Sequence, residues 1–275
     1  MEQYAAGIVL YNPDIKRLKE NLDAVCGQVE RVYCYNNGLQ NAGEINALLN
    51  TYGNIRVIGT GTNVGIATAL NELTKEAEKD NIEWILTLDQ DSVVCDGMVE
   101  VLASFKNEKD VAIICPAIED IRRKNETLAV AQNTIDDVEF CITSGSFMNI
   151  QKTLEIGGFD EWLFIGLVDN EICYRIKLNG YRIIRNNVMI LNHELGNLTP
   201  SRLENVYLRL GNLLHSETIK KLSYKRAVSP MRLYYATRNM IYLKKRYANY
   251  MSTAMWNKML IKNSLSSIVR GGGAV

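Results

Sequence analysis

The chain has 275 residues, of which 47% are hydrophobic and 23% charged, and its formal net charge is zero. This length allows one large α/β domain or a domain with a helical appendage, and the composition excludes a disordered chain. No apolar run approaches the roughly 20 residues that a membrane-spanning helix needs.

The N-terminal half of the sequence alternates strand and helix patterns. A continuous apolar run at residues 5–11 predicts a buried parallel strand, and an apolar stripe on residues 15–25 predicts an amphipathic helix. Repetition of this alternation predicts a doubly wound α/β fold, with a mostly parallel sheet flanked by helices. The further segments are strands 29–35, 55–58, 83–88 and 111–115, and helices 44–52, 66–79 and 98–105.

Polar residues follow the predicted strands at their carboxyl ends, or lie in the loop that follows. Ligands of doubly wound sheets bind in the crevice beyond these ends, so we expect the polar residues to converge on one site. The residues concerned are Tyr11, Asn12, Asn36, Asn37, Asn63, Asp89, Gln90 and Asp91.

Asp89 and Asp91 are the strongest candidates for binding a metal ion. Their side chains face the same way in an extended segment, and Mg²⁺ or Mn²⁺ typically takes one or two carboxylates together with substrate phosphates. The pair therefore predicts a divalent metal and diphosphate site. The alternative is a solvated acidic turn after a strand.

The pattern loosens after Pro116. Residues 119–126 are charged and typical of a loop, whereas residues 137–149 indicate a strand around the small residues Ser144 and Gly145. Small residues there fit either a close approach to a ligand or a kink in the strand. A helix over 169–179 and strands over 181–184 and 188–191 follow.

Two residues of this second half are candidates for chemistry. Asp169 opens the predicted helix, where it either caps the helix or serves as a general base that removes a proton from a hydroxyl group. His193 follows a strand; it is either structural or a nitrogen ligand to a metal held by Asp91.

The zero net charge hides an asymmetry. Residues 200–275 carry 14 Lys and Arg against 2 Asp and Glu, which leaves 17 basic and 29 acidic residues in 1–199. We therefore expect a catalytic domain over 1–199 and a basic helical region over 200–275. This region predicts an anionic membrane surface or a lipid-pyrophosphate group as partner, rather than nucleic acid, for which no motif is present. A solvated helical face or a helix pair that joins a homodimer is the alternative.

Six scattered cysteines form no Cys-x-x-Cys pair. This pattern favours reduced, buried thiols and a cytoplasmic protein, attached at most to the inner face of the cell membrane.

Several motifs stand in the order found in one enzyme family. They are Ile8–Asn12, Tyr35–Gly38, Asn63–Ala67 with Leu70-Asn71, Leu88–Asp91, Thr143–Ser146, Gly157–Asp160, Val168–Arg175, His193–Gly196 and Tyr234–Asn239. Together they resemble the GT-A glycosyltransferases of family 2, and within these the bacterial rhamnosyltransferase-like group. The resemblance covers residues 4 to about 247. Asn36 stands where this family usually has an Asp that reads the base.

The resemblance implies an inverting transfer of a sugar from a nucleotide-sugar donor to a glycan or a lipid-linked saccharide. It assigns the catalytic base to Asp169, the metal to Asp91 with His193, and the ribose or diphosphate contact to Asp89. It also implies that the turns at Tyr11-Asn12, Asn36-Asn37 and Asn63 lie at the nucleotide, and that Ser144-Gly145 line the donor sugar. The group favours dTDP-L-rhamnose as donor, with UDP-hexoses as the alternative.

Two other functions compete with this one. A nucleotidyltransferase would need a Gly-rich first turn with Arg and Lys, which Tyr11–Asp14 does not supply. A non-catalytic sugar-nucleotide-binding protein would not need Asp89, Asp91, Asp169 and His193 together. The sequence has neither a phosphate-binding Gly-x-x-x-x-Gly-Lys loop nor a dinucleotide-binding fingerprint. An ATPase or dehydrogenase function is therefore disfavoured.

Overall fold

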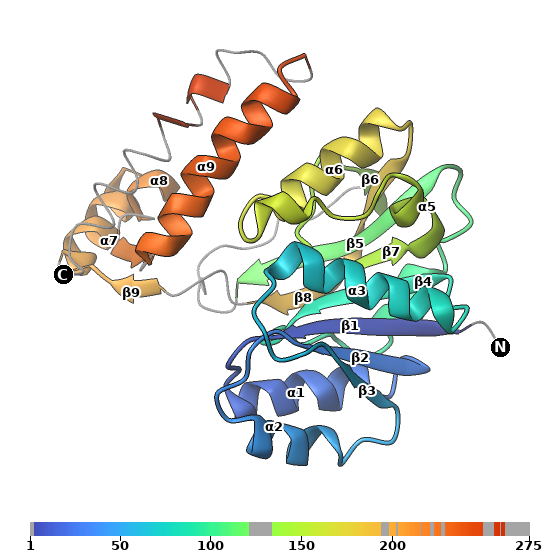
Figure 1. Cartoon of the computed structure of the whole chain (residues 1–275). Coiled ribbons are helices and arrows are strands. Elements are labelled where there is room, and N and C mark those ends of the chain that lie inside the picture. Colours follow the sequence, from blue (N-terminus) through green and yellow to red (C-terminus); the bar gives the residue numbers. More distant parts are fainter. Residues whose placement is uncertain are drawn as a thin grey trace. The chain divides into compact units, whose positions relative to one another are not determined.

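The computed structural model describes residues 3–120, 134–193, 198–201, 203–214, 216–220, 223–226, 229–249, 256–258 and 260–261 (Figure 1). The chain divides into two compact units, Met1–Glu194 and Leu195–Val275.

The first unit is an α/β structure. Its strands are β1 (Tyr4–Leu10), β2 (Arg31–Asn36), β3 (Ile55–Ile58), β4 (Trp84–Asp89), β5 (Val111–Asp120), β6 (Ile135–Asp137), β7 (Ser146–Asn149) and β8 (Arg182–His193). Its helices are α1 (Ile15–Val25), α2 (Ala42–Leu49), α3 (Ile66–Lys79), α4 (Met98–Ala103), α5 (Ile150–Glu155) and α6 (Val168–Leu178), with a short 3-10 helix at Glu161–Leu163.

The eight strands form one sheet in the order β3-β2-β1-β4-β7-β5-β8-β6. Neighbouring strands run parallel except where β7 pairs with β4 and β5 and where β6 pairs with β8. In Figure 1, α1 and α2 cover one face of the sheet and α3 covers the other. The predicted, mostly parallel sheet flanked by helices is therefore confirmed.

The burial of β1 and α1 follows from their sequences. β1 is buried from Ala5 to Leu10, as expected of a central parallel strand with both faces covered. α1 buries Leu18, Leu22 and Val25, which lie on one helical stripe. Asp14 caps this helix, because its carboxylate accepts a hydrogen bond from the Arg17 amide at 2.8 Å.

The second half of the sheet differs from the sequence expectation. β5 continues past Pro116 to Asp120, so residues 119 and 120 belong to a strand; residues 121–126 of the expected loop lie outside the described residues. β8 is one strand, not two. The register between β5 and β8 shifts after Pro116, and Asn186 Oδ1 accepts the Val188 and Met189 amides at 2.9 and 2.8 Å. The asparagine therefore supports a bulge within the strand where the sequence indicated a break.

The expected strand over residues 137–149 was also wrong in extent. Only residues 135–137 and 146–149 form strands, and the segment between them is irregular. A turn fits the small residues at its end, because Gly145 has a φ of +84°.

The described residues of the second unit are mainly helical. It contains α7 (Glu204–Leu213), α8 (Glu217–Lys220) and α9 (Pro230–Arg246), together with an antiparallel pair of short strands, β9 (Leu198–Pro200) and β10 (Tyr224–Arg226), that the sequence did not predict. Ser229 caps α9, and Pro230 occupies its first turn. In the described part of the chain, no helix combines the length and the apolar character needed to cross a bilayer.

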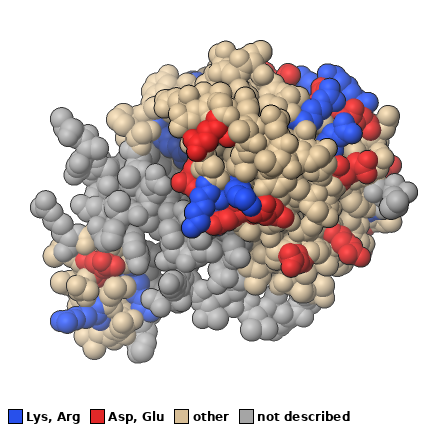
Figure 2. Space-filling view, turned by 90° about the horizontal axis from the view of Figure 1, so that it is seen from below, with Lys and Arg blue, Asp and Glu red and all other residues tan. Residues whose placement is uncertain are grey.

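Charges of both signs are interspersed on the face of the molecule shown in Figure 2. On α1, Arg17 pairs with Glu20 and Lys19 pairs with Asp23 at helical spacing. Exposed pairs of this kind contribute little to stability.

Candidate active site

The carboxyl ends of β3, β2, β1 and β4 lie next to one another at one edge of the sheet. Two side-chain contacts join the turns after β1 and β4: the Tyr11 amide donates to Gln90 Oε1 at 2.8 Å, and Gln90 Nε2 donates to the Tyr11 carbonyl at 3.2 Å. The structure thus brings Tyr11 and Gln90 together, as expected for residues at adjacent strand ends.

The predicted asparagines hold these turns in shape. Asn12 Oδ1 accepts the Gln40 amide at 2.7 Å, which ties the first turn to the second. Asn37 Oδ1 accepts the Val64 amide at 2.8 Å and so ties the second turn to the loop before α3.

Two more asparagines act locally. Asn36 Oδ1 accepts the Gly38 amide at 3.2 Å, and Asn63 Oδ1 accepts the Gly65 amide at 3.0 Å. Such side-chain turns fix the backbone at strand ends. The four asparagines therefore gather at one edge, and each shapes it with its own side-chain oxygen.

The turn at Asp89–Asp91 is anchored through its backbone. The Asp89 amide donates to Ser144 Oγ at 3.0 Å, and the Asp89 carbonyl accepts Asn21 Nδ2 at 2.8 Å. Arg17 Nε donates to the Asp91 carbonyl at 2.8 Å. These bonds to backbone atoms hold the turn against α1 and Ser144.

Sequence reasoning missed Arg17 and Asn21. They lie four residues apart on α1, and Asn21 is fully buried on the apolar side of that helix. The sequence signal for Asn21 was its position beside the apolar stripe of Leu18 and Leu22. Arg17 Nη2 and Asn21 Oδ1 are buried and have no hydrogen-bond partner among the described residues.

A hollow of about 460 Å³ opens beside this turn. Acidic and basic side chains both contribute to its wall. Its lining residues are Asp14, Lys16, Arg17, Glu20, Gln90 and Asp91.

Ser144 and Gly145 directly precede β7, and the Gly145 amide donates to the Thr87 carbonyl of β4 at 2.7 Å. Besides its bond to Asp89, Ser144 Oγ lies 2.7 Å from Ser92 Oγ. A Cβ atom on Gly145 would come within 2.8 Å of the Leu191 side chain and 3.1 Å of Pro116. The small residues here thus allow close packing of the protein against itself.

Asp169 lies in the first turn of α6. It is not the cap, because Leu167 occupies that position; Asp169 Oδ1 accepts the neighbouring Asn170 amide at 3.0 Å. Burial raises the pKa of this carboxyl to about 6, and the negative charges of Cys141 and Asp89 add to the increase. The charge of Asp89 therefore acts on the Asp169 carboxyl, as the smallest of these causes.

The loop before α6 is strained. Phe164 and Leu167 have φ values of 60° and 61°, in a region that residues with side chains rarely occupy. The Phe164 carbonyl accepts the Ile66 amide at the start of α3, at 2.7 Å. A Cβ atom on Gly65 would lie 2.6 Å from the Phe164 ring, so only glycine allows this contact.

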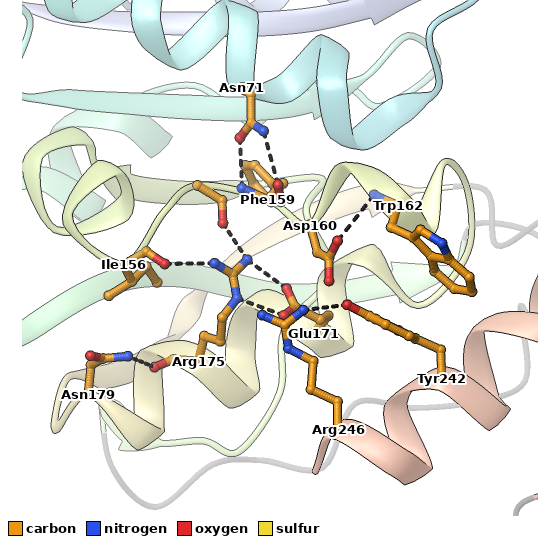
Figure 3. A network of polar contacts seen from close by, with 11 residues as sticks. Asn71, Ile156, Phe159, Asp160, Trp162, Glu171, Arg175, Asn179, Tyr242 and Arg246 are labelled. Atoms are coloured by element: carbon orange, nitrogen blue, oxygen red, sulfur yellow. Dashed lines mark hydrogen bonds and ion pairs between the residues drawn. The ribbon is translucent and has the colours of Figure 1, made fainter.

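Arg175 and Glu171 support this loop from within α6 (Figure 3). Arg175 Nε and Nη2 each donate to Glu171 at 2.7 Å, and Glu171 is fully buried. Arg175 also donates to the Ile156 carbonyl at 2.7 Å and to the Gly158 carbonyl. The guanidinium group therefore neutralises a buried carboxylate and fixes the turn that leads into the loop.

Asn71 on α3 holds the same turn from the other side (Figure 3). Asn71 Nδ2 donates to the Phe159 carbonyl at 3.0 Å and to Glu161 Oε1 at 2.8 Å, and Asn71 Oδ1 accepts the Phe159 amide at 2.7 Å. Sequence analysis included Asn71, Glu171 and Arg175 in the motifs but assigned them no role.

The residues that would hold a metal ion at the end of β4 are Asp89 and Asp91. The described residues contain no set of three Asp, Glu, Cys or His side chains placed to hold a metal. His193 ends β8, but its side chain lies outside what the structure describes. A pair of carboxylates fits a cation whose remaining ligands are phosphate oxygens and water, as Mg²⁺ commonly uses.

Comparison with known proteins identifies the family. Residues 6–173 match the model of glycosyl transferase family 2. Over 186 residues the chain is 26% identical to the dTDP-rhamnosyl transferase RfbF of Shigella flexneri, a match that covers 62% of this chain and 62% of RfbF. The chain thus spans less than two thirds of this relative.

Solved structures share the fold. One is residues 1–349 of TarS from S. aureus, solved in complex with UDP, which is 14% identical to this chain. The match covers 95% of this chain and 78% of the TarS chain, with a TM-score of 0.59. The mannosyltransferase PcManGT from Pyrobaculum calidifontis, solved with GDP-Man and Mn²⁺, is 12% identical, with coverages of 99% and 76% and a TM-score of 0.58. The expected GT-A fold is confirmed by this likeness.

Proposed function

Because the chain belongs to glycosyl transferase family 2, we propose that it is an inverting enzyme that transfers a sugar from a nucleotide-sugar donor to a hydroxyl group. The observation that carries this proposal is the pair of Asp89 and Asp169. One ends a central strand, the other is a half-buried carboxyl with a pKa of about 6, and their charges interact. A carboxylate poised in this way suits proton abstraction near neutral pH.

In the proposed reaction, the Asp169 carboxylate accepts the proton of the acceptor hydroxyl as its oxygen attacks the anomeric carbon. The bond between that carbon and the diphosphate oxygen breaks, and the nucleoside diphosphate leaves with the bonding electron pair. Attack occurs on the face opposite the diphosphate, so the configuration at the anomeric carbon is inverted. No covalent bond between the sugar and the protein is needed.

Asp91, Asp89 and His193 are the proposed ligands of a divalent metal, Mn²⁺ or Mg²⁺. When bound, such an ion would stabilise the negative charge that develops on the departing diphosphate. Support comes from the carboxylates at the end of β4 and from the Mn²⁺ with which PcManGT was solved. Arg17 and Asn21 would position these ligands, since they hold the carbonyls of Asp91 and Asp89.

The nucleotide is proposed to lie along the edge formed by the first four strands. Tyr11 is half exposed there, beside Gln90 and the turns that contain the four asparagines. These residues are Tyr11, Asn12, Asn36, Asn37, Asn63, Asp89 and Gln90, with Ser144 and Gly145 toward the sugar.

The donor that we favour is dTDP-L-rhamnose, and the alternative is a UDP-hexose. RfbF, named as a dTDP-rhamnosyl transferase, supports the first, and the UDP complex of TarS is consistent with the second. The acceptor is proposed to be a cell-surface polysaccharide or a lipid-linked glycan that reaches Asp169 beside the loop at residues 160–167. Trp162 of this loop is 48% exposed and offers an aromatic face to a sugar ring.

We place the protein in the cytoplasm, with the second unit as its contact to an anionic membrane surface or to a second copy. The basic last turn of α9, formed by Lys244, Lys245 and Arg246, supports the membrane role. A non-catalytic protein that only binds sugar nucleotides is the competing function.

Thermal unfolding with a panel of dTDP- and UDP-sugars, with and without Mn²⁺ or Mg²⁺, tests the donor and metal assignments. A ligand that binds the native state raises the midpoint by mass action. We expect one nucleotide class to raise it, more strongly with metal, and Asp91→Asn to remove the metal-dependent part. A panel without any shift would contradict the proposal. Binding without release of nucleoside diphosphate would favour the non-catalytic alternative.

A further inference from the structure

Three thiols meet close to Asp169, whose carboxyl senses the charge of Cys141. Cys115 lies on β5, Cys141 in the segment between β6 and β7, and Cys173 on α6. The sulfur atoms of Cys141 and Cys173 are 3.7 Å apart, and Cys115 also forms a hydrogen bond with Cys141. The proposed transfer reaction uses none of these thiols.

The three thiols differ in exposure and acidity. Cys141 is half-buried, whereas Cys115 and Cys173 are buried. Hydrogen bonds from Cys115 and Cys173 hold the pKa of Cys141 well below its usual range, while the pKa values of those two donors are raised. The least buried residue of the three is thus also the one whose thiol ionises first, which makes Cys141 the nucleophile of the cluster.

We propose that Cys141 and Cys173 form an oxidisable pair that a hydroperoxide closes to a disulfide. The Cys141 thiolate attacks a peroxide oxygen, the O–O bond breaks, and water or an alcohol leaves after taking up a proton. Cys173, on losing its proton, attacks the resulting sulfenic sulfur, the S–O bond breaks, and the hydroxide takes up a proton and leaves as water. The two electrons lost by the two sulfur atoms reduce the peroxide.

Closing the pair requires the sulfur atoms to approach from 3.7 Å to about 2.05 Å. Cys173 follows Asp169 by four residues, so both lie on the same side of α6. Cys141 precedes Ser144 by three residues, and Ser144 holds the Asp89 amide. The disulfide therefore draws together the two segments that position the carboxylates Asp89 and Asp169.

The effect of this disulfide on the rate of sugar transfer rests on the proposed function. Displacement of a catalytic group by about 1 Å costs on the order of a hundredfold in rate. We therefore expect oxidation to slow sugar transfer by tenfold or more, and a dithiol reductant to restore it.

The test exposes the full-length chain, under native conditions, to increasing hydrogen peroxide, followed by alkylation and mass spectrometry of a non-reduced digest. The expected product is a pair of peptides joined through Cys141 and Cys173. Its mass is lower by two hydrogen atoms than the sum of the two separate peptides. Cys141→Ser and Cys173→Ser should abolish it. Cys95→Ser is the matched control, because Cys95 is also half-buried but has the Met189 thioether as its sulfur neighbour.

The disulfide-linked peptides found in the digest of the wild-type chain decide the inference even where a variant fails to fold. No intramolecular link, or a link through Cys115 alone, would overturn it. A Cys141–Cys173 link that leaves nucleoside diphosphate release unchanged would overturn the coupling to the active site. If the reduced chain releases no nucleoside diphosphate from any donor, the proposed function fails, and the link is still judged from its mass.

Discussion

Asp169 is the residue on which the proposed sugar transfer depends. Its carboxyl is half-buried in the first turn of α6, and burial raises its pKa from 3.8 to about 6. A general base must be deprotonated to accept a proton, so activity requires the form that exists above this pKa.

We therefore predict that kcat/KM rises with pH through about 6 and then levels off. The profile of kcat/KM reports the free enzyme. A cation near Asp89 would offset the repulsion of that carboxylate and move the rise to lower pH. A rate that is flat between pH 5 and pH 8 would contradict the role of Asp169.

Residue types at strand ends were predictable, but their partners were not. The order of the strands places Tyr11, Asn37 and Asp89 at one edge, as the alternating pattern implies. Which side-chain oxygen accepts which amide depends on how the turns face one another. Asn21 shows the limit: its amide reaches the Asp89 carbonyl across 68 positions of the chain, a contact without a local signal.

At the scale of elements, α6 and the turn before it act as a unit because Arg175 joins them. Its guanidinium group pairs with the buried Glu171 and donates to the carbonyls of Ile156 and Gly158. Removing one partner of a buried ion pair takes a charge-assisted partner from the charge that stays buried, which costs more than the pair itself contributes to stability.

We predict that Arg175→Met lowers the free energy of unfolding by about 3–5 kcal/mol. The matched control is Arg182→Met. Arg182 also bonds its carboxylate partner, Asp137, through two nitrogens at 2.9 Å, but in an exposed position, so its loss should cost about 1 kcal/mol or less. Urea unfolding monitored by circular dichroism measures both. Equal losses in the two variants would refute the structural role of Arg175.

Elements with a strong period followed from the sequence, whereas those shaped by distant contacts did not. β1 and α1 were predictable because burial sets a clear apolar pattern in each. The full length of β8 was not predictable, because the adjacent Asn186 and Asn187 are typical of a turn. Only the pairing with β5, with its shifted register after Pro116, keeps this segment in the sheet.

At the scale of the whole molecule, the chain joins an acidic α/β unit to a basic, mainly helical one. The doubly wound sheet was predictable from the alternation of strands and helices, since each parallel crossover needs a helix. The short pair of β9 and β10 was not, because three-residue strands carry almost no periodic signal.

We predict that the full chain floats with vesicles that contain anionic lipid at low salt and is released at high salt. Each basic residue near such a surface contributes about 1 kcal/mol, and salt screens this attraction. Replacing Lys244, Lys245 and Arg246 by Ala should weaken flotation, whereas replacing Lys16 and Lys19 on α1 should not. Failure to float at low salt would favour the alternative in which the second unit joins two copies.

The central claim is that Asp169 is the base of a sugar-transfer reaction. The most direct test measures nucleoside diphosphate released from dTDP-L-rhamnose and UDP-hexoses, with Mn²⁺ or Mg²⁺, by the wild-type chain and by Asp169→Asn. We predict release by the wild type and a fall of about 10³-fold in the variant, with an unchanged thermal shift by the donor. Turnover by the variant within about tenfold of the wild type, well inside the effect expected of a general base, or no release from any donor by the wild type, would contradict the account.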